Sequence, residues 1–453
     1  MKYFGTDGFR GEAGVALTAE HAFRIGRFLG RFFQKEGQRV RVAIGKDTRR
    51  SSYMLEYAMA AGLTASGADA YMLHVTATPS VSYTVAAEGF DCGVMISASH
   101  NPYTDNGIKL VNARGEKMED STLLAVEEYL DRARELPDLP YAAGEAVGRI
   151  VDHAAGRNRY LGYLISLSQY SFKPYTVALD CANGSAWMLA RSVFEALGAR
   201  TLLLGTAPDG LNINRALGST HPEALCRFVR ENHADVGFAF DGDADRCIAV
   251  DAQGEEVNGD HILYLLATEM KRAGELRSNT VVTTVMSNLG LYRALDAVGI
   301  GYIQTAVGDR YVYERMAAEG HSIGGEQSGH IILSKYATTG DGILTAIKVM
   351  EAMIGAKRPL HELVAAVRMY PQVLKSVRVR DKAAVREDGV IRAKIEEIGQ
   401  KLSGTGRIIL RESGTEPVVR VMLEAESRAL AEQLSDEVIS LIRARGHAEV
   451  GDA

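Results

Sequence analysis

Hydrophobic residues along the chain alternate between helix-like and strand-like spacing. Thr18 can cap a first helix, which Gly37 would end, and the apolar stripe of this helix consists of Ile25, Phe28, Leu29 and Phe32. Short continuous apolar runs follow at residues 40–44, 94–96, 177–179 and 236–240, each leading into a polar loop. The alternation predicts layered α/β structure with the polar loops gathered at one edge of each sheet, where ligands usually bind.

Three changes in the pattern divide the chain: a Gly- and Ala-rich stretch at residues 142–156, a second change near 251–259, and Met369-Tyr370-Pro371. Beyond the third, the pattern is α+β, with a strand at 374–379, a helix at 390–402, a hairpin at 407–424 and a helix at 429–445. A chain of 453 residues is also too long for a single core. We therefore predict three mixed α/β domains and a smaller C-terminal α+β domain, at residues 1–150, 151–252, 253–368 and 369–453.

The composition, 46% hydrophobic and 24% charged, is that of an ordinary globular protein. The formal charge of −6 gives no general attraction to nucleic acid or to an anionic membrane, and no run of about 18 apolar residues is present. The N-terminus carries no apolar leader. Cys92, Cys181, Cys226 and Cys247 are widely spaced and are expected to be free thiols. We predict a cytoplasmic protein with no nucleic-acid or membrane partner.

Three carboxylates alternate in Asp241-Gly242-Asp243-Ala244-Asp245, directly after a predicted strand. They repel one another unless a cation lies among them, and oxygen ligands favour a hard ion such as Mg²⁺. An EF-hand does not fit, because its sixth position would be Arg246 instead of Gly and its twelfth Ala252 instead of Glu. A solvated acidic turn is the alternative to a metal site formed by Asp241, Asp243 and Asp245.

Three other loops carry side chains suited to a phosphorylated sugar. Ser99 lies in a turn fixed by His100-Asn101-Pro102, which predicts an exposed hydroxyl; in isolation, such a serine usually bonds its own turn. The glycine-bounded loop 324–330 has groups that bind sugar hydroxyls, although a plain turn has the same pattern. The loop near residues 411–420 predicts an anion site, or else a hairpin loop with incidental charges. The residues concerned are Glu326, Ser328 and His330, and then Arg411, Ser413, Gly414, Thr415 and Arg420.

These four segments, in this order, resemble the α-D-phosphohexomutases, and the resemblance runs from Phe4 to about Glu424. It implies that Ser99, not Ser97, carries a phosphoryl group, and that one of its oxygens joins the three aspartates around one Mg²⁺ per chain. Lys109 would lie close by as a cation or proton-transfer group.

The resemblance also assigns roles in substrate binding. Arg10 and Arg246 would contact phosphate, Glu326 and Ser328 would bind the sugar, and His330 would transfer a proton. The loop with Arg411, Ser413, Gly414, Thr415 and Arg420 would grip the phosphate that does not react. Lys46, Arg49 and Arg50 are instead expected to form a solvated run of charges.

Further segments resemble the family members that act on amino sugars: residues 212–214, 218–223, 286–290, 307–311, 338–342, and Gln327. The implied reaction interconverts glucosamine 6-phosphate and glucosamine 1-phosphate through glucosamine 1,6-bisphosphate, in the amino sugar metabolism that leads to UDP-N-acetylglucosamine. The resemblance also implies four domains around a central cleft and a homodimer. The alternatives are a phosphomannomutase or phosphoglucomutase of the same family, a non-catalytic sugar-phosphate-binding protein, and a metal-dependent phosphatase.

Overall fold

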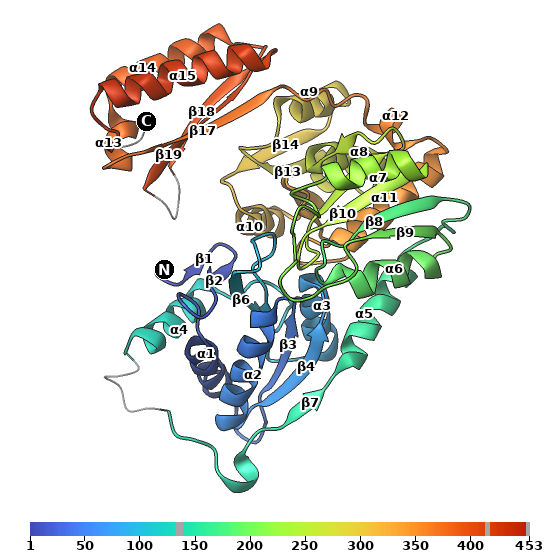
Figure 1. The fold of residues 1–453 in the computed structure, drawn as a ribbon, viewed down its shortest axis with the longest axis vertical. Coiled ribbons are helices and arrows are strands. Elements are labelled where there is room, and N and C mark those ends of the chain that lie inside the picture. The colour runs from blue at the N-terminus through green and yellow to red at the C-terminus, as the bar shows by residue number, and fades with distance from the viewer. Residues whose placement is uncertain (133–138, 413–416, 450–453) are drawn as a thin grey trace. The chain divides into compact units, whose positions relative to one another are not determined.

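The computed structural model describes residues 1–132, 139–412 and 417–449 (Figure 1). The chain divides into two compact units, one made of Met1–Met286 and Ile300–Ala365, the other of Ser287–Gly299 and Ala366–Ala453. The first unit contains three mixed sheets and the second a single antiparallel sheet, so the predicted fold class is confirmed. No helix in the described ranges is long and apolar enough to cross a membrane. All four cysteines are free thiols.

The first sheet is covered by helices on both faces. Along β3, Val42 and Ile44 pack in a core with α1, α2 and α4, whereas Ala43 packs against α3 on the opposite face. The strand order is β1 (Phe4–Gly5), β2 (Gly8–Glu12), β6 (Asp105–Asn112), β5 (Cys92–Ile96), β3 (Arg41–Lys46), β4 (Asp69–Val75) and β7 (Ile150–Asp152). The helices are α1 (Ala19–Phe32), α2 (Arg50–Ala65), α3 (Thr78–Glu88) and α4 (Asp120–Arg132), with a 3₁₀ turn at Gly144–Ala146.

The first helix begins where the sequence predicts, because Thr18 accepts a hydrogen bond from the backbone N–H of His21. It ends at Phe32, so the predicted stop at Gly37 is wrong. Gly37 instead occupies a left-handed turn, with φ +73°, between the bridged residues Lys35 and Gln38.

The second and third sheets complete the first unit. The second has the order β12 (Glu256–Val257), β11 (Cys247–Asp251), β10 (Val236–Phe240), β8 (Thr176–Asp180) and β9 (Arg200–Leu204), with α5 (Ala154–Ser166), α6 (Ala186–Ala196) and α7 (Glu223–Asn232). The third has the order β14 (Gly301–Thr305), β13 (Thr280–Thr284), β15 (Ile323–Gly325) and β16 (Ile331–Leu333). Its helices are α8 (Gly259–Arg272), α10 (Asp309–Glu319), α11 (Gly342–Ala356) and α12 (Leu360–Val364), with a 3₁₀ turn at Arg277–Asn279.

The second unit has the α+β pattern predicted for the C-terminal part. Its sheet has the order β17 (Gln372–Arg378), β19 (Val418–Glu424) and β18 (Arg407–Glu412). The core residues Val377 and Val421 of this sheet cluster with Leu434 and Val438 of α15 (Arg428–Ala444). The unit also contains α9 (Leu289–Ala297), α14 (Gly389–Lys401) and a short helix, α13 (Lys382–Glu387), which the sequence pattern did not predict.

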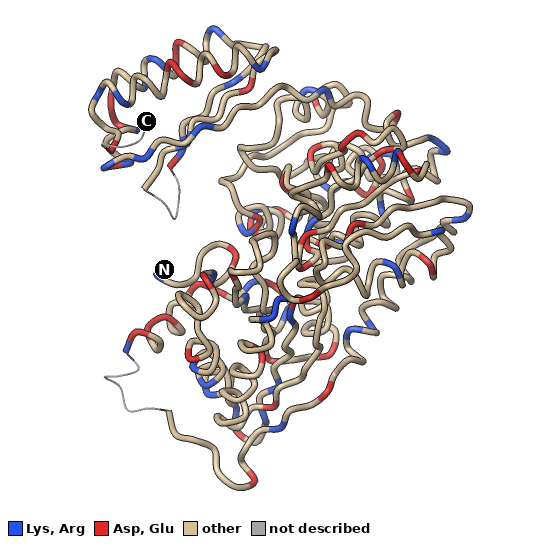
Figure 2. Tube along the Cα trace, in the orientation of Figure 1, with Lys and Arg blue, Asp and Glu red and all other residues tan. Residues whose placement is uncertain are grey.

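Polar loops leave the ends of several strands of the first unit. Residues 97–104 follow β5, residues 241–246 connect β10 to β11, and residues 326–330 connect β15 to β16. In each case a buried strand delivers the loop, as expected for α/β sheets. Charged residues are spread over the helices, strands and loops of the first unit (Figure 2), and among these three loops residues 241–246 carry most of them.

Candidate active site

Ser99 lies in the turn after β5 and is held against the loop that follows β10. Its hydroxyl donates to the carboxylate of Asp241, 142 residues further along the chain. Its backbone N–H donates to the hydroxyl of Ser97 at 2.9 Å. Ser99 has φ +52°, and none of its surface is exposed, so the predicted exposure of its hydroxyl is wrong. Neighbouring loops cover the turn and leave Ser99 oriented toward the carboxylates.

The three aspartates are arranged as a metal site requires. Their ligand oxygens lie within 4.8 Å of one another, and all three side chains are buried. Within the described residues, Oδ1 of Asp243 and Oδ1 of Asp245 receive no hydrogen bond. Buried carboxylate oxygens without donors are costly unless a cation binds them. The burial rules out a solvated acidic turn, and the donor set fits a hard divalent ion.

The pKa values of the three aspartates shift in different directions because the carboxylates are crowded together and have different cationic neighbours. Burial, with Asp245 and Asp243 as neighbours, raises the pKa of Asp241 well above its usual value. Burial also opposes ionisation of Asp243 and Asp245, but their ion pairs with Lys109 bring the pKa of each below its usual value. Two of the three carboxylates are therefore held ionised by a neighbouring ammonium group.

Lys109, on β6, joins the aspartates to the N-terminal segment. Its Nζ lies 2.8 Å from Oδ2 of Asp243 and 3.3 Å from both Oδ2 of Asp245 and Oδ1 of Asp7. Burial lowers the pKa of Lys109, but the carboxylates raise it above its ordinary value. Lys109 therefore stays charged, which favours a role as a cation over a role in proton transfer. Arg10 pairs with the same Asp7.

His100 lies beside Ser99, and Arg246 and Arg10 lie near the aspartates. Nδ1 of His100 lies 3.5 Å from the hydroxyl oxygen of Ser99, and burial lowers the pKa of His100 to about 3, so the imidazole is neutral at pH 7. Burial also lowers the pKa of Arg246, but the carboxylates of Asp241 and Asp245 raise it by more. Both Arg10 and Arg246 have a buried Nε without a hydrogen-bond acceptor among the described residues, which suits the binding of an anion.

His330 lies between two carboxylates and a backbone donor. Its Nδ1 is 3.6 Å from Asp245, its Nε2 is 3.3 Å from Asp309, and the Gly340 N–H donates to Nε2 at 3.0 Å. Burial lowers the pKa of His330, but Asp309 and Asp245 raise it by more. Asp309 also pairs with Lys117 at 2.7 Å. The imidazole thus has a carboxylate beside each nitrogen, and the two carboxylates favour its charged form.

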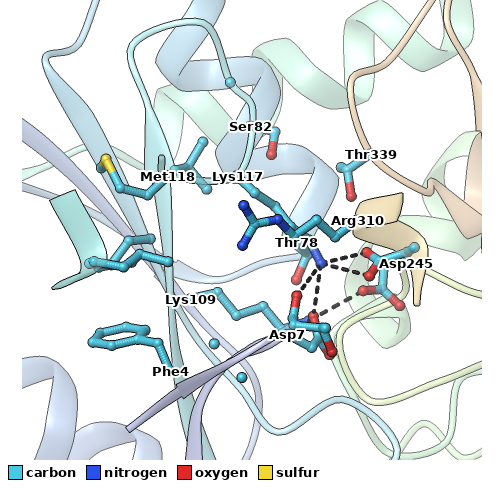
Figure 3. Close-up of a pocket in the computed structure, with 18 residues that line it drawn as sticks. Phe4, Asp7, Thr78, Ser82, Lys109, Lys117, Met118, Asp245, Arg310 and Thr339 are labelled. Atoms are coloured by element: carbon cyan, nitrogen blue, oxygen red, sulfur yellow. Dashed lines mark hydrogen bonds and ion pairs between the residues drawn. The ribbon is translucent and has the colours of Figure 1, made fainter. Parts of the chain in front are cut away.

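A cavity lies among these residues (Figure 3). It holds about 40 Å³ and opens to solvent, and Lys109, Lys117 and Asp7 meet in it. The sequence-predicted residues Lys109 and Asp245 line this cavity, together with Asp7, Asp309 and Lys117, for which no role was predicted. Two of these three residues could have been inferred from the sequence. Asp7 lies in the same segment as Arg10, and Asp309 lies at residues 307–311, which resemble family members that act on amino sugars.

The loop between β15 and β16 presents two groups for a polar ligand. Oε1 of Glu326 accepts from the Gly308 N–H at 3.1 Å, and burial and Asp309 raise the pKa of Glu326. The hydroxyl of Ser328 is buried without a partner among the described residues. An unpaired hydroxyl of this kind is available to a sugar hydroxyl.

The C-terminal pair of arginines lies in the second unit. Arg411 on β18 is directly opposite Arg420 on β19. Burial and the charge of Arg420 lower the pKa of Arg411. Like charges on facing strand positions repel, so this pair favours a bound anion. Ser413, Gly414 and Thr415 lie outside the described residues.

The predicted solvated run at residues 46–50 is only partly correct. Arg50 is exposed, but Lys46 and Arg49 are buried, with 1% and 0% of their surface accessible. Lys46 lies 3.8 Å from Glu56 and over the ring of Tyr53, whereas Arg49 pairs with Asp47 and turns toward the Ser99 loop. The loop is enclosed because it follows a central strand and packs under neighbouring loops.

Comparison with known proteins places this geometry in a family. Four family models described as phosphoglucomutase/phosphomannomutase match the chain: α/β/α domain I at residues 1–136, domain II at 158–254, domain III at 258–370 and the C-terminal domain at 374–441. The chain belongs to the phosphoglucomutase/phosphomannomutase family. It is a phosphohexomutase, an isomerase, and the buried aspartates agree with a metal site in such an enzyme.

Individual relatives agree with this membership. A phosphoglucosamine mutase of Lachnospira eligens is 60% identical over 449 residues, which cover 99% of each chain. The crystal structure of a phosphohexomutase-family protein from Burkholderia thailandensis has a TM-score of 0.80 at 24% identity and covers 100% of this chain and 98% of its own. An Aspergillus fumigatus N-acetylphosphoglucosamine mutase, solved with GlcNAc-6P and magnesium, has a TM-score of 0.68 at 18% identity and covers 98% of this chain and 96% of its own. The two solved structures show the fold shared with this phosphohexomutase.

Proposed function

We propose that this phosphohexomutase interconverts glucosamine 6-phosphate and glucosamine 1-phosphate by way of a phosphoserine at Ser99. One observation carries the proposal: the Ser99 hydroxyl donates to Asp241 within a buried aspartate triplet, two of whose oxygens receive no hydrogen bond from the described part of the chain. A serine in this position can hold a phosphoryl group beside a metal ion. The 60% identity to a phosphoglucosamine mutase supports glucosamine as the sugar.

The first transfer moves a phosphoryl group from Ser99 to the sugar. The bond between Ser99 Oγ and phosphorus breaks while the free hydroxyl of glucosamine 6-phosphate forms a bond to the same phosphorus. The hydroxyl gives up its proton to His330, which lies beside Asp245 and Asp309, and Ser99 Oγ takes up one proton as it leaves, so that the serine is released as its hydroxyl. The product of this step is glucosamine 1,6-bisphosphate, which reorients so that its other phosphate returns to Ser99.

Charged side chains stabilise the group in transit. One Mg²⁺ per chain, held by Asp241, Asp243, Asp245 and a phosphoserine oxygen, would supply charge neutralisation. Lys109 stays protonated beside the aspartates, and the Nε donors of Arg10 and Arg246, which have no acceptor among the described residues, can bind phosphate oxygens. A loose phosphoryl transition state spreads negative charge over its oxygens, so several fixed cations lower the barrier.

The remaining residues bind the sugar phosphate. Glu326 and Ser328 are proposed to bind the sugar, since the buried hydroxyl of Ser328 has no partner in the ranges that the structure describes. Arg411 and Arg420, with Ser413, Gly414 and Thr415, are proposed to bind the phosphate that does not react. The facing guanidinium groups support this assignment. A role in forming UDP-N-acetylglucosamine, a cytoplasmic location and a homodimer remain predictions.

The test is ³¹P NMR of the enzyme with Mg²⁺, a trace of glucosamine 1,6-bisphosphate and one sugar phosphate at a time. We expect the glucosamine 1-phosphate resonance to grow from glucosamine 6-phosphate faster than the corresponding products grow from mannose or glucose 6-phosphate. Faster turnover of mannose or glucose 6-phosphate would assign a different sugar. Release of inorganic phosphate alone would identify a phosphatase.

A further inference from the structure

Two side chains donate to the same two carbonyl oxygens of the Ser99 turn. Nδ2 of Asn214 donates to the carbonyl oxygen of Ser99 at 2.8 Å and to that of Asn101 at 3.0 Å. Nη2 of Arg49 donates to these oxygens at 3.2 and 2.6 Å. A carbonyl oxygen has two lone pairs, so each of the two oxygens accepts from both side chains.

The turn needs such support because of its backbone conformation. Ser99 has φ +52°, a left-handed conformation that costs a non-glycine residue about 1–3 kcal/mol and persists only where the surroundings fix it. Ser99 and Arg49 are fully buried, and Asn214 is 7% exposed, so water does not replace these donors. Gly242 packs directly against the Ser99 carbonyl oxygen, since a Cβ at position 242 would lie only 2.5 Å from this oxygen.

The two donors come from different parts of the first unit. Arg49 follows β3 of the first sheet, whereas Asn214 lies between β9 and α7 of the second, 115 residues after Ser99. Asn214 is itself fixed, because its N–H donates to the Ala182 carbonyl at 2.8 Å. The two regions also join directly beside Arg49, where the Arg50 N–H donates to the Gly210 carbonyl at 3.0 Å. The position of Ser99 therefore depends on how the loops of both sheets meet.

We propose that Arg49 and Asn214 are positioning residues that hold Ser99 in the conformation from which its phosphoryl group is transferred. The proposal rests on the proposed function of Ser99. Both residues act through backbone carbonyls and not through the serine hydroxyl, which donates to Asp241. Loss of either donor leaves the nucleophile, the aspartates and the sugar-binding residues in place but frees the turn, so the chemical step slows while substrate binding is retained.

Asn214→Gly is the sharpest variant. It removes the side-chain amide, and glycine adopts the left-handed backbone conformation of this position without strain, since Asn214 has φ +58°. Asn214→Asp keeps the shape of the side chain but has no N–H donor, and it replaces the glycine variant if that one does not fold. Asn212→Ala is the matched control, because the hydrogen bonds that the Asn212 side chain makes with described residues all stay within its own loop, to the backbone of Ala207 and Asp209. Arg49→Lys tests the second donor.

The measurements are kcat and KM for glucosamine 6-phosphate, melting temperature, and phosphorylation of Ser99 by the bisphosphate, followed by intact mass. We expect kcat of Asn214→Gly or Asn214→Asp to fall about 10- to 100-fold, the loss typical of a displacement near 1 Å, with KM close to that of Asn212→Ala and the protein still folded at the assay temperature. Arg49→Lys should show the same split. Phosphorylation of Ser99 should slow in parallel with kcat.

Two kinetic results would overturn the proposal. One is an unchanged kcat in both Asn214 variants, and the other is a rise in KM at constant kcat, which would make Asn214 a substrate-binding residue. A loss of activity that only follows a loss of folded protein would also contradict it. If the wild-type enzyme turned over no glucosamine phosphate, the proposed substrate would fail separately, and the phosphorylation rate of Ser99 would still test the two positioning residues.

Discussion

Nζ of Lys109 lies 2.8 Å from Oδ2 of Asp243, although the two residues are 134 positions apart in the sequence. The ammonium group compensates a buried carboxylate that also belongs to the predicted metal site. Lys109 and a divalent ion therefore share the negative charge of the same aspartates. The two cations repel one another, whereas both attract the negatively charged phosphoryl group of the substrate.

Lys109→Met is expected to separate these two effects. Turnover should fall about 100-fold or more, because one fixed cation is lost from the transition state. Affinity for Mg²⁺ should rise, because a competing positive charge is removed from Asp243 and Asp245. Steady-state kinetics and calorimetric titration with Mg²⁺ measure the two quantities.

Lys117→Met is the matched control for this pair of effects. Lys117 pairs with Asp309 at 2.7 Å and lies 3.6 Å from Asp7, and no ion pair with the aspartate triplet is found among the described residues. Its loss should leave the affinity for Mg²⁺ nearly unchanged. Weaker Mg²⁺ binding in Lys109→Met would contradict the shared-charge account.

Asp243→Asn should lower stability without metal and should also lose most of the stabilisation by metal. In the presence of a chelator, the variant should melt at a lower temperature than the wild type, because the pair with Lys109 that holds the pKa of Asp243 below its usual value is lost. Mg²⁺ at about 100 times its Kd should stabilise the wild type by about 2.7 kcal/mol and the variant much less. Thermal melts with EDTA and with Mg²⁺ test both parts, and equal stabilisation of the two proteins by Mg²⁺ would exclude Asp243 as a ligand.

Arg411→Ala is expected to weaken binding of the substrate phosphate. Loss of a charge-assisted hydrogen bond to phosphate costs about 1.5–3 kcal/mol, which corresponds to a rise in KM of about 10- to 150-fold. Relief of the repulsion with Arg420 should leave the melting temperature equal or higher. Kinetics with glucosamine 6-phosphate, and competition by inorganic phosphate, measure the change. Arg378→Ala, at an exposed arginine of β17, is the control, and an unchanged KM in Arg411→Ala would contradict the assignment.

The pH dependence of stability should carry the signature of Asp341. Burial raises the pKa of this carboxyl from 3.8 to about 6, although the Leu344 N–H and the Tyr160 hydroxyl act to lower it. Because the pKa is raised on folding, protonated Asp341 contributes about 3 kcal/mol to the free energy of unfolding. This contribution is present in full below pH 4 and is lost as the pH rises through 6. Asp341→Asn keeps a helix-capping side chain without this titration. The melting temperature of the wild type should therefore fall relative to Asp341→Asn between pH 4 and 6.

Tyr160→Phe provides the second arm of the same experiment. The Tyr160 hydroxyl donates to Asp341 at 2.8 Å and favours its ionised form. Its removal should move the midpoint of the pH-dependent loss upward. A difference between wild type and Asp341→Asn that is constant with pH would show that Asp341 does not titrate in this range.

Local patterns in the sequence were sufficient for the elements and for several functional loops. The alternation of apolar and polar runs predicted the strands at residues 40–44 and 236–240, since burial between two helical layers needs continuous apolar residues. The alternating carboxylates predicted the buried triplet, because their repulsion is a property of a few adjacent residues. The short helix Lys382–Glu387 was missed, since six residues give too little periodicity.

Burial of charge could not be predicted in the same way. Arg49 looks like a surface residue in the sequence, yet its partners are Asp47 nearby and the carbonyls of Ser99 and Asn101 about 50 positions away. Likewise Asn214 meets Ser99 only because two sheets bring their loops together. Such contacts are set by tertiary structure, which no local pattern encodes.

The central claim is that the phosphoryl group passes through Ser99. The most direct measurement starts from enzyme labelled with ³²P at Ser99 and mixes it with unlabelled glucosamine 6-phosphate and Mg²⁺. The account predicts that the label leaves the protein within one turnover and appears in glucosamine 1,6-bisphosphate and the monophosphates, whereas Ser99→Ala takes up no label and Ser97→Ala still does. Label that stays on the protein during turnover, or that leaves only as inorganic phosphate, would contradict it.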